Sequence, residues 1–263
     1  MTPDATVLYV SNSGAESISI VDLDKLQTTG QVRFPPIPLS LTAPLATPGE
    51  IAASQLGPMF ILNTGVNGAI WQVIGDTAVP RPASQVIGTT NGQPKSIPSP
   101  RSMVATPGGE FILLSGADGF AYLYDVTVDD FVQAKQLTAF VQAQGYYGPA
   151  SAGPKGQYFV LNGNVLNQSL TPVSRPVGTA RPISGVMAVN ANTYARFTMP
   201  IRANVTTNPS DAGAFELVDV NTGSTTRTVA ALEGPLLQVT GTQRAAVNSR
   251  TIAIDSPARP PTR

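Results

Sequence analysis

The stretch RSMVATPGGEFILLSGADGFAYLYDVTVDDFVQAKQL, residues 101–137, contains four strand patterns separated by turns. The four patterns are residues 102–106 (short and mixed), 110–115 (continuously apolar), 120–126 (rich in aromatics) and 131–137 (alternating apolar and polar). Glycines in PGG (107–109) and GADG (116–119) permit the positive φ angles of tight turns. A continuous apolar run is typical of a strand buried on both faces, and alternation is typical of an edge strand. The stretch therefore predicts a four-stranded antiparallel meander.

The apolar second strand of this meander recurs along the chain. Its copies are residues 7–10, 59–62, 111–114, 158–161 and 193–197, each preceded by a turn rich in Pro, Gly or Asn. The first four copies end at intervals of 52, 52 and 47 residues. A period of roughly 40–50 residues with several strands per repeat is typical of a β-propeller. We therefore expect an all-β fold, a propeller of five to six four-stranded blades, or a partial propeller from a longer chain.

The expected propeller domain covers residues 1–256 and is followed by a proline-rich tail, 257–263. The blades are expected near residues 2–32, 50–87, 101–137, 149–177, 183–230 and 235–256. The first blade begins at its second strand, and the last shows three strands. Either strands from both ends of the chain close the ring, which removes free sheet edges, or the chain is a piece of a longer one. Three long connections, 35–48, 80–100 and 201–213, are expected to be loops on one face of the ring.

A second recurrence concerns the third strand, which ends in aspartate in three repeats. Residues 18–22, 121–125 and 215–219 share this pattern and end at Asp22, Asp125 and Asp219. An aspartate at such a position accepts hydrogen bonds from the N–H groups of the following turn. The three carboxylates are therefore interpreted as structural, with metal binding as the alternative. Asp129 and Asp130 are interpreted as a solvated loop.

Residues 3–22, PDATVLYVSNSGAESISIVD, resemble the YVTN-type β-propeller repeat of bacterial and archaeal surface proteins, a surface-layer or NHL-like repeat. Residues 107–125 are similar to it as well, whereas residues 71–76 lack the Val-Asp ending and residues 164–177 show no clear third strand. Ala5 stands where the family usually has glycine. The resemblance implies a propeller architecture and an extracellular, periplasmic or cell-surface location, and it implies no particular activity.

Composition excludes several classes of function. Lys plus Arg equals Asp plus Glu, at 16 each, so the sequence offers no basic surplus for nucleic acid. Cysteine and histidine are both absent, which removes thiolate and imidazole chemistry and most metal sites, and we expect no metal or cofactor. No apolar run reaches the roughly 18 residues of a membrane helix, and residues 1–10 do not form a signal peptide. We expect a monomer with no membrane insertion.

Five residues at the starts of innermost strands, which would line the mouth of a propeller channel, are candidate ligand contacts: Glu50, Arg101, Tyr146, Tyr147 and Arg181. Arginine and tyrosine commonly make polar and sugar-like contacts. The alternative is that the arginines cap loop carbonyls and the tyrosines cover the rim. Trp71, in an alternating strand, is interpreted as core.

These observations favour a non-catalytic binding or scaffold propeller of a secreted or surface bacterial protein, with a protein or carbohydrate ligand. The alternative is an enzyme, a lyase or glycoside hydrolase, that uses carboxylate and tyrosine chemistry at the channel mouth. A second acid beside a tyrosine or arginine there would favour the enzyme.

Overall fold

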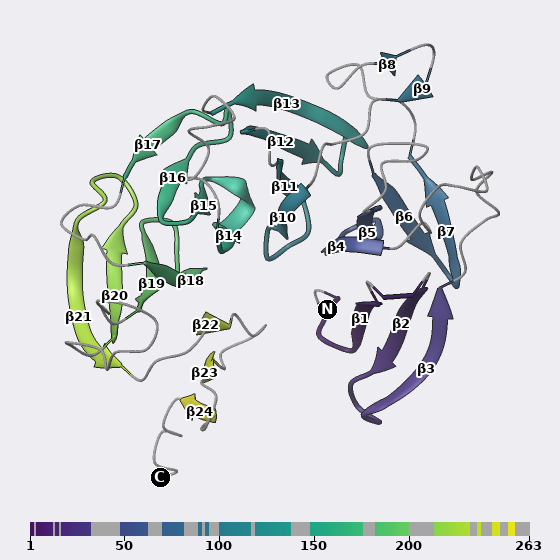
Figure 1. Ribbon diagram of the computed structural model, residues 1–263, viewed down its shortest axis with the longest axis horizontal. Coiled ribbons are helices and arrows are strands. Elements are labelled where there is room, and N and C mark those ends of the chain that lie inside the picture. The colour runs from purple at the N-terminus through teal and green to yellow at the C-terminus, as the bar shows by residue number, and fades with distance from the viewer. Residues whose placement is uncertain are drawn as a thin grey trace, which may run out of the picture. The chain divides into compact units, whose positions relative to one another are not determined.

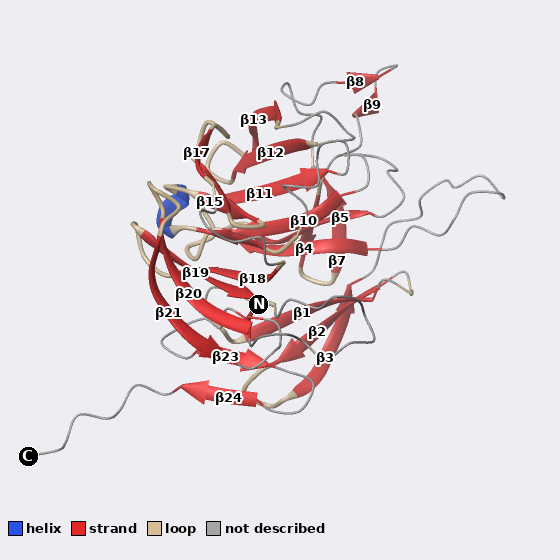
Figure 2. Cartoon of the chain, turned by 60° about the vertical axis from the view of Figure 1, so that its left-hand side comes forward, coloured by secondary structure: helices blue, strands red, loops and turns tan. Residues whose placement is uncertain are grey.

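The computed structural model describes residues 1–2, 4–12, 14–15, 17–32, 48–62, 70–81, 89–90, 93–94, 100–116, 119–137, 148–175, 182–199, 213–231, 236–237, 244–247 and 252–255. This part of the chain is almost entirely β-strand, with a one-turn 3₁₀ helix at Pro154–Gly156 (Figure 2). No described helix is long and apolar enough to span a membrane. The expected all-β class is confirmed.

The described residues form six antiparallel sheets of three or four strands that follow one another along the chain, and within each the strands pair in sequence order (Figure 1). The first three sheets are β1–β3 (Val7–Asn12, Ser17–Asp22, Gln27–Val32), β4–β7 (Pro48–Ser54, Gly57–Leu62, Trp71–Ile74, Thr77–Pro80) and β10–β13 (Pro100–Ala105, Phe111–Gly116, Phe120–Asp125, Asp130–Gln136). The last three are β14–β17 (Ala150–Ala152, Phe159–Leu161, Asn164–Leu166, Pro172–Ser174), β18–β21 (Ile183–Ala188, Thr193–Thr198, Gly213–Asp219, Thr225–Ala231) and β22–β24 (Leu236–Leu237, Arg244–Val247, Ile252–Asp255). We call these the first to sixth sheets.

Two differences from the sequence-based expectation concern local structure. Residues 164–177, which show no clear third strand in sequence, supply both β16 and β17. These strands are only three residues long, and short strands carry too few residues for periodicity to be read. The 80–100 connection contains a small hairpin of β8 (Thr89–Thr90) and β9 (Gln93–Pro94). The 35–48 and 201–213 loops lie outside the described residues except at Pro48 and Gly213.

The chain forms two compact units. The first is Met1–Tyr147 with Gln168–Leu170 and holds the first three sheets, and the second is Gly148–Asn167 with Thr171–Arg263 and holds the last three. Within the first unit, β4 lies beside both β1 and β10, and within the second, β18 lies beside both β14 and β22. In each unit the first strands of successive sheets are therefore neighbours, as in propeller-like blades.

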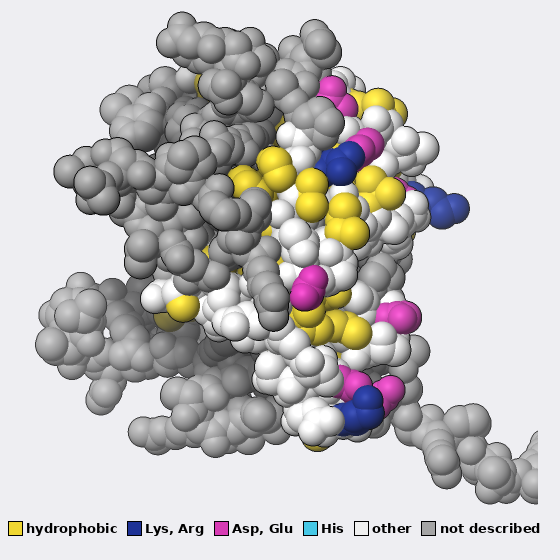
Figure 3. Space-filling model, turned by 90° about the vertical axis from the view of Figure 1, so that its right-hand side faces the viewer, with side chains coloured by type: hydrophobic (Ala, Val, Ile, Leu, Met, Phe, Trp, Pro, Cys, Tyr) yellow, Lys and Arg dark blue, Asp and Glu magenta, His cyan; other side chains and the backbone are white. Residues whose placement is uncertain are grey.

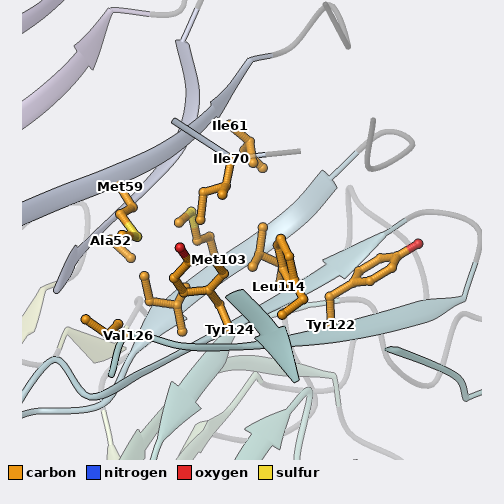
Figure 4. Packing of buried hydrophobic residues seen from close by; sticks show 11 residues of the cluster. Ala52, Met59, Ile61, Ile70, Met103, Leu114, Tyr122, Tyr124 and Val126 are labelled. Carbon is orange, nitrogen blue, oxygen red and sulfur yellow. The ribbon is translucent and has the colours of Figure 1, made fainter. Parts of the chain in front are cut away.

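The core of the first unit lies between neighbouring sheets. One cluster joins the second and third sheets (Figure 4) and includes Met59, Ile70, Met103, Leu114 and Tyr124. Each apolar side chain of this size stabilises the fold by about 2 kcal/mol when buried. The continuous apolar run of β11 is explained by this packing, because both faces of that strand are covered.

Trp71 lies in a second cluster, between the first and second sheets. It is 2% exposed and stacks on Phe60 with ring centroids 6.3 Å apart, beside Ile18 and Val32. Its interpretation as a core residue is confirmed.

The second unit repeats this arrangement between the fourth and fifth sheets. Tyr158, Val160, Tyr194 and Val218 form its core. The Tyr158 hydroxyl lies 2.8 Å from the carbonyl oxygen of Asn190 and 2.9 Å from that of Thr193, so it links the two sheets directly. Burial raises the pKa of the Tyr158 phenol, because the charged form would lose its hydration.

Candidate ligand-binding surface

The first strands β4, β10 and β18 each carry a β-bulge close to their start. The pairing shifts between Pro48 and Ile51 in β4, between Pro100 and Ser102 in β10, and between Ile183 and Gly185 in β18. A bulge turns a side chain out of the regular alternation, and bulges are common beside functional sites. Glu50 and Arg101 stand at the first two bulges. We call residues 48–50 and 100–102 with Ser11 and Asn12 the strand-start surface of the first unit. Figure 3 shows one face of the molecule, on which acidic, basic and hydrophobic side chains are interspersed.

A proline lies at or directly before the start of the first strands β4, β10, β14 and β18. Pro48 and Pro100 are the first residues of β4 and β10, and Pro149 and Pro182 come directly before β14 and β18. Proline is tolerated at the first position of a strand because its missing N–H lies outside the ladder. This recurrence is a sequence signal for the strand starts, and the strand periodicity alone does not reveal it.

Glu50 is the acidic residue of the strand-start surface. Its side chain is exposed, and it makes no hydrogen bond or ion pair with any described residue. Surrounding protein nevertheless removes part of the hydration of the carboxyl group, and this raises its pKa. Among the described residues this carboxylate has no cationic partner, which makes it a candidate ligand contact.

Small neutral polar groups lie at the end of β1, which is tied to the start of β4. The Ser11 hydroxyl lies 3.0 Å from the carbonyl oxygen of Pro48 and 2.7 Å from that of Gly49, which ties β1 to the start of β4. The Asn12 amide donates to the hydroxyls of Ser17 and Ser19, at 3.0 Å each. Hydroxyl and amide groups of this kind suit an uncharged polar ligand.

The other candidate residues are placed less fully. Arg101 lies on β10, at its bulge, but its side chain is outside the described part of the chain. Tyr146, Tyr147 and Arg181 also lie outside the described residues. Their grouping with Glu50 therefore stays a prediction.

The three strand-ending aspartates lie at the other end of their sheets, and each accepts turn N–H groups as expected. Asp22 Oδ1 accepts from the N–H groups of residues 24 and 25, Asp125 Oδ1 from 127 and 128, and Asp219 Oδ1 from 221 and 222. Hydrogen bonds from Thr222 hold the pKa of Asp219 below its usual value, and those from Lys25 do so for Asp22. Their structural interpretation is confirmed. No three His, Cys, Asp or Glu side chains of the described residues are grouped to hold a metal.

The interpretation of Asp129 as part of a solvated loop is wrong. Asp129 forms an ion pair with Arg81, which directly follows β7 of the second sheet, and it accepts a 2.5 Å hydrogen bond from the Tyr124 hydroxyl. Arg81 also donates to Gln72 Oε1, at 2.8 Å. Asp129 and Asp130 look equivalent in the sequence. In the structure Asp129 has a positive φ of 59°, and its side chain contacts Arg81 of the neighbouring sheet.

A second ion pair, more deeply buried than the first, lies in the fifth sheet. Arg196, 1% exposed, sits opposite Glu216, with Nε 2.5 Å from Oε2, and its Nη2 donates to Thr225 Oγ1 at 3.1 Å. Arg196 occurs within the strand pattern of residues 193–197, but its partner is 20 residues away. No local pattern identifies such a pair.

Comparison with known proteins gives a likeness of fold. The chain is similar to hydrazine synthase of Kuenenia stuttgartiensis, a β-propeller-containing protein, with a TM-score of 0.56 and 14% sequence identity. The similarity covers 89% of this chain and 65% of that chain, so the chain spans less than two thirds of it. At this identity the similarity shows the fold alone. In all, 958 chains of solved structures match this fold, and a fold shared so widely does not identify a function. No protein-family model and no curated protein matches the sequence.

Proposed function

We propose that the chain is a β-propeller binding module of the YVTN-like type, built from six blades, in a secreted or cell-surface bacterial protein. The domain would extend over residues 1–256 and act as a monomer. Support comes from the six sequential antiparallel sheets, from the neighbouring first strands in each unit, and from the resemblance of residues 3–22 to the repeat.

The ligand-binding site proposed is the strand-start surface. The observation that carries this proposal is Glu50, an exposed carboxylate at a β-bulge, without a partner among the described residues and with a raised pKa. In a propeller, the first strands line the central channel, so Arg101, Tyr146, Tyr147 and Arg181 would join Glu50 at its mouth. A carboxylate with hydroxyls, amides and tyrosines is chemistry that suits a carbohydrate.

The test is a glycan array probed with the purified chain and with Glu50→Gln. We expect the wild-type chain to retain a defined set of glycans and Glu50→Gln to bind them at least about tenfold more weakly, because a hydrogen bond to a charged group contributes about 1.5–3 kcal/mol. The free energy of unfolding should change by less than about 0.5 kcal/mol, since Glu50 is exposed and unpaired in the described structure.

Asp76→Asn is the matched control, because Asp76 is an exposed acid in the β6–β7 turn. Retention of no glycan would contradict a carbohydrate ligand and favour a protein partner. Release of new reducing ends from a retained glycan, lost in Glu50→Gln, would favour the glycoside hydrolase alternative.

A further inference from the structure

The ion pair of Arg196 and Glu216 occupies a position that is uncharged in other sheets. In the first, third and fifth sheets the second strand begins opposite the aspartate that ends the third strand, so their registers can be compared. Three residues further along, the facing residues are Val10 and Ser19 in the first sheet, Leu114 and Tyr122 in the third, and Arg196 and Glu216 in the fifth. Leu114 is 0% exposed and Arg196 is 1% exposed, so a charge replaces an apolar group at the same depth.

Stability alone does not explain this replacement. Removing two charges from water costs about as much as their attraction returns, and apolar residues of similar volume often stabilise a fold equally well or better. Buried ionic and polar pairs are best known for selecting one alignment of neighbouring elements. The alignment of the strands that carry Arg196 and Glu216 is therefore the feature to consider.

The connection between the second and third strands differs in length among the sheets. β11 and β12 are joined by residues 117–119 and β15 and β16 by residues 162–163, whereas β19 and β20 are joined by residues 199–212. The type and length of a tight turn fix the register of its hairpin. A long connection leaves several registers open, because the entropy of loop closure changes little with a few residues of length. The register of β20 against β19 is therefore left to their side chains.

Arg196 on β19 makes two bonds that depend on this register. Its Nε lies 2.5 Å from Oε2 of Glu216 on β20, and its Nη2 lies 3.1 Å from Oγ1 of Thr225 on β21. A slip of two residues keeps every side chain on its own face of the sheet, but it moves both partners by about 7 Å. It would place Arg196 opposite Ala214 or Val218. A buried guanidinium separated from its partners is strongly destabilising, so the slipped registers are disfavoured.

The second sheet offers a parallel. Its β5 and β6 are also joined by a long connection, residues 63–70. Gln72 of β6 is 7% exposed, and its amide donates a hydrogen bond to the carbonyl oxygen of Leu56, directly before β5. Here too a buried polar side chain bonds across a pair of strands that no tight turn aligns.

We propose that the Arg196–Glu216 pair is a conformational device that selects one register of β20 on β19, and we call it the register pair. It performs in the fifth sheet the task that the tight turn of residues 117–119 performs in the third. The long connection of residues 199–212 can then vary in length and sequence without loss of strand alignment. This inference does not depend on the strand-start surface.

The test is an apolar double variant of the full chain, Arg196→Met with Glu216→Leu, which keeps the side-chain volumes close to those of the wild type. Nuclear magnetic resonance of the isotopically labelled protein reports the register through the amide signals of β19 and β20 and through cross-strand contacts such as Ala195 with Leu217. We expect one set of signals with this contact in the wild type. In the double variant we expect a second set of at least about one tenth of the intensity, with Ala195 two residues out of register.

A tight-turn version of the chain is the matched control. Replacement of residues 199–213 by the Ala-Asp-Gly of residues 117–119 supplies the turn of the third sheet, because the two sheets have the same register from their terminal aspartates. In this version we expect a single set of signals both with the register pair and with the apolar double variant.

A single native set of signals in the double variant with the long connection would overturn the proposal, as would several sets in both versions. If the double variant with the long connection does not fold, its folding with the tight turn would support the proposal. Its failure to fold with the tight turn would instead overturn it, because the pair would then be needed for stability and not for the register.

Discussion

The contact between the second and third sheets and that between the fourth and fifth sheets have the same construction with different chemistry. Arg81 directly follows β7, the last strand of the second sheet, and faces Asp129 in the turn after the third strand of the third sheet. In the same way, Arg175 directly follows β17, the last strand of the fourth sheet, and faces Gly223 in the turn after the third strand of the fifth sheet. The same 94 residues separate Arg81 from Arg175 and Asp129 from Gly223. Asp129 and Gly223 both have positive φ.

The interactions at the two positions differ. In the first unit, the Asp129 carboxylate reaches across to the Arg81 side chain. In the second unit, the Gly223 backbone approaches Arg175 so closely that a Cβ would lie 2.0 Å from the Arg175 carbonyl oxygen. Ser174 adds a 2.6 Å hydrogen bond to the Val220 carbonyl. The two contacts therefore share a positive-φ turn residue that faces the preceding sheet, but different groups complete them.

The largest effect is expected for Gly223→Ala. The added methyl group would overlap the Arg175 carbonyl oxygen, and alanine is strained at φ 71°. We expect a loss of about 3 kcal/mol or more in the free energy of unfolding, measured by urea denaturation. Gly75→Ala is the matched control, because Gly75 has φ 62° in a comparable turn and no atom lies within 4 Å of the place that its added methyl group would take. A loss there of about 1 kcal/mol is expected, and equal losses would contradict the close approach at Gly223.

A smaller loss is expected for Asp129→Asn, which keeps the shape and the tolerance of positive φ but removes the charge. Arg81 would be left half-buried without its ion pair, and we expect about 1–2 kcal/mol of destabilisation by urea denaturation. Added salt should reduce the difference only partly, because the pair is partly shielded from solvent. An effect no greater than that of Asp76→Asn would show that Asp129 does not join the two sheets.

The corresponding link in the second unit is tested by Tyr158→Phe. At pH 7 we expect a loss of about 1 kcal/mol, because the hydroxyl no longer donates to the Asn190 and Thr193 carbonyls. The pKa of Tyr158 is raised in the folded state, so its stabilisation is fully present below about pH 10, the unfolded value, and is lost as the pH rises further. Urea denaturation at pH 7 and pH 11 should therefore show the difference between wild type and Tyr158→Phe shrinking or reversing. A constant difference would contradict a buried, neutral hydroxyl.

The smallest effect is expected in the first sheet, where Leu26 occupies the position of Asp129 and Gly223. Leu26 has φ 52° and is 80% exposed, so it bears the strain without a compensating contact. Leu26→Gly should stabilise the fold by about 0.5 kcal/mol. Glycine relieves the backbone strain at positive φ, and this gain exceeds the loss that comes from the greater conformational entropy of glycine in the unfolded chain. Val128→Gly, an exposed turn residue without positive φ, should instead destabilise by a similar amount. The sign of each change, read from thermal unfolding, decides between these explanations.

The order and type of most strands could be predicted from the sequence, because the patterns that mark strands and turns are local. The apolar run at 111–114 and the terminal Asp125 depend on pleat and turn chemistry within a few residues, and both were placed correctly. The ion pairs of Asp129 and Arg196 were missed because their partners lie 48 and 20 residues away. The candidate site could be predicted only in part. Glu50 lies at the start of the first strand β4, as the sequence pattern predicts, but the bulge beside it depends on the pairing of β4 with β5, which no local pattern reveals.

The proposed six-bladed propeller would bring the starts of the first strands together around a central channel. The chain has no native cysteine, so spin labels can be placed at Glu50→Cys and Pro182→Cys, two exposed positions, and their separation measured by pulsed electron resonance. Six sheets packed face to face at about 10 Å around a ring give a circumference of about 60 Å and hence an inner diameter of about 20 Å. For the propeller we expect a single distribution of distances centred near that separation, with a width set by the label arms. A distribution that is broad, or centred beyond about 40 Å, would contradict a propeller with a shared ligand surface.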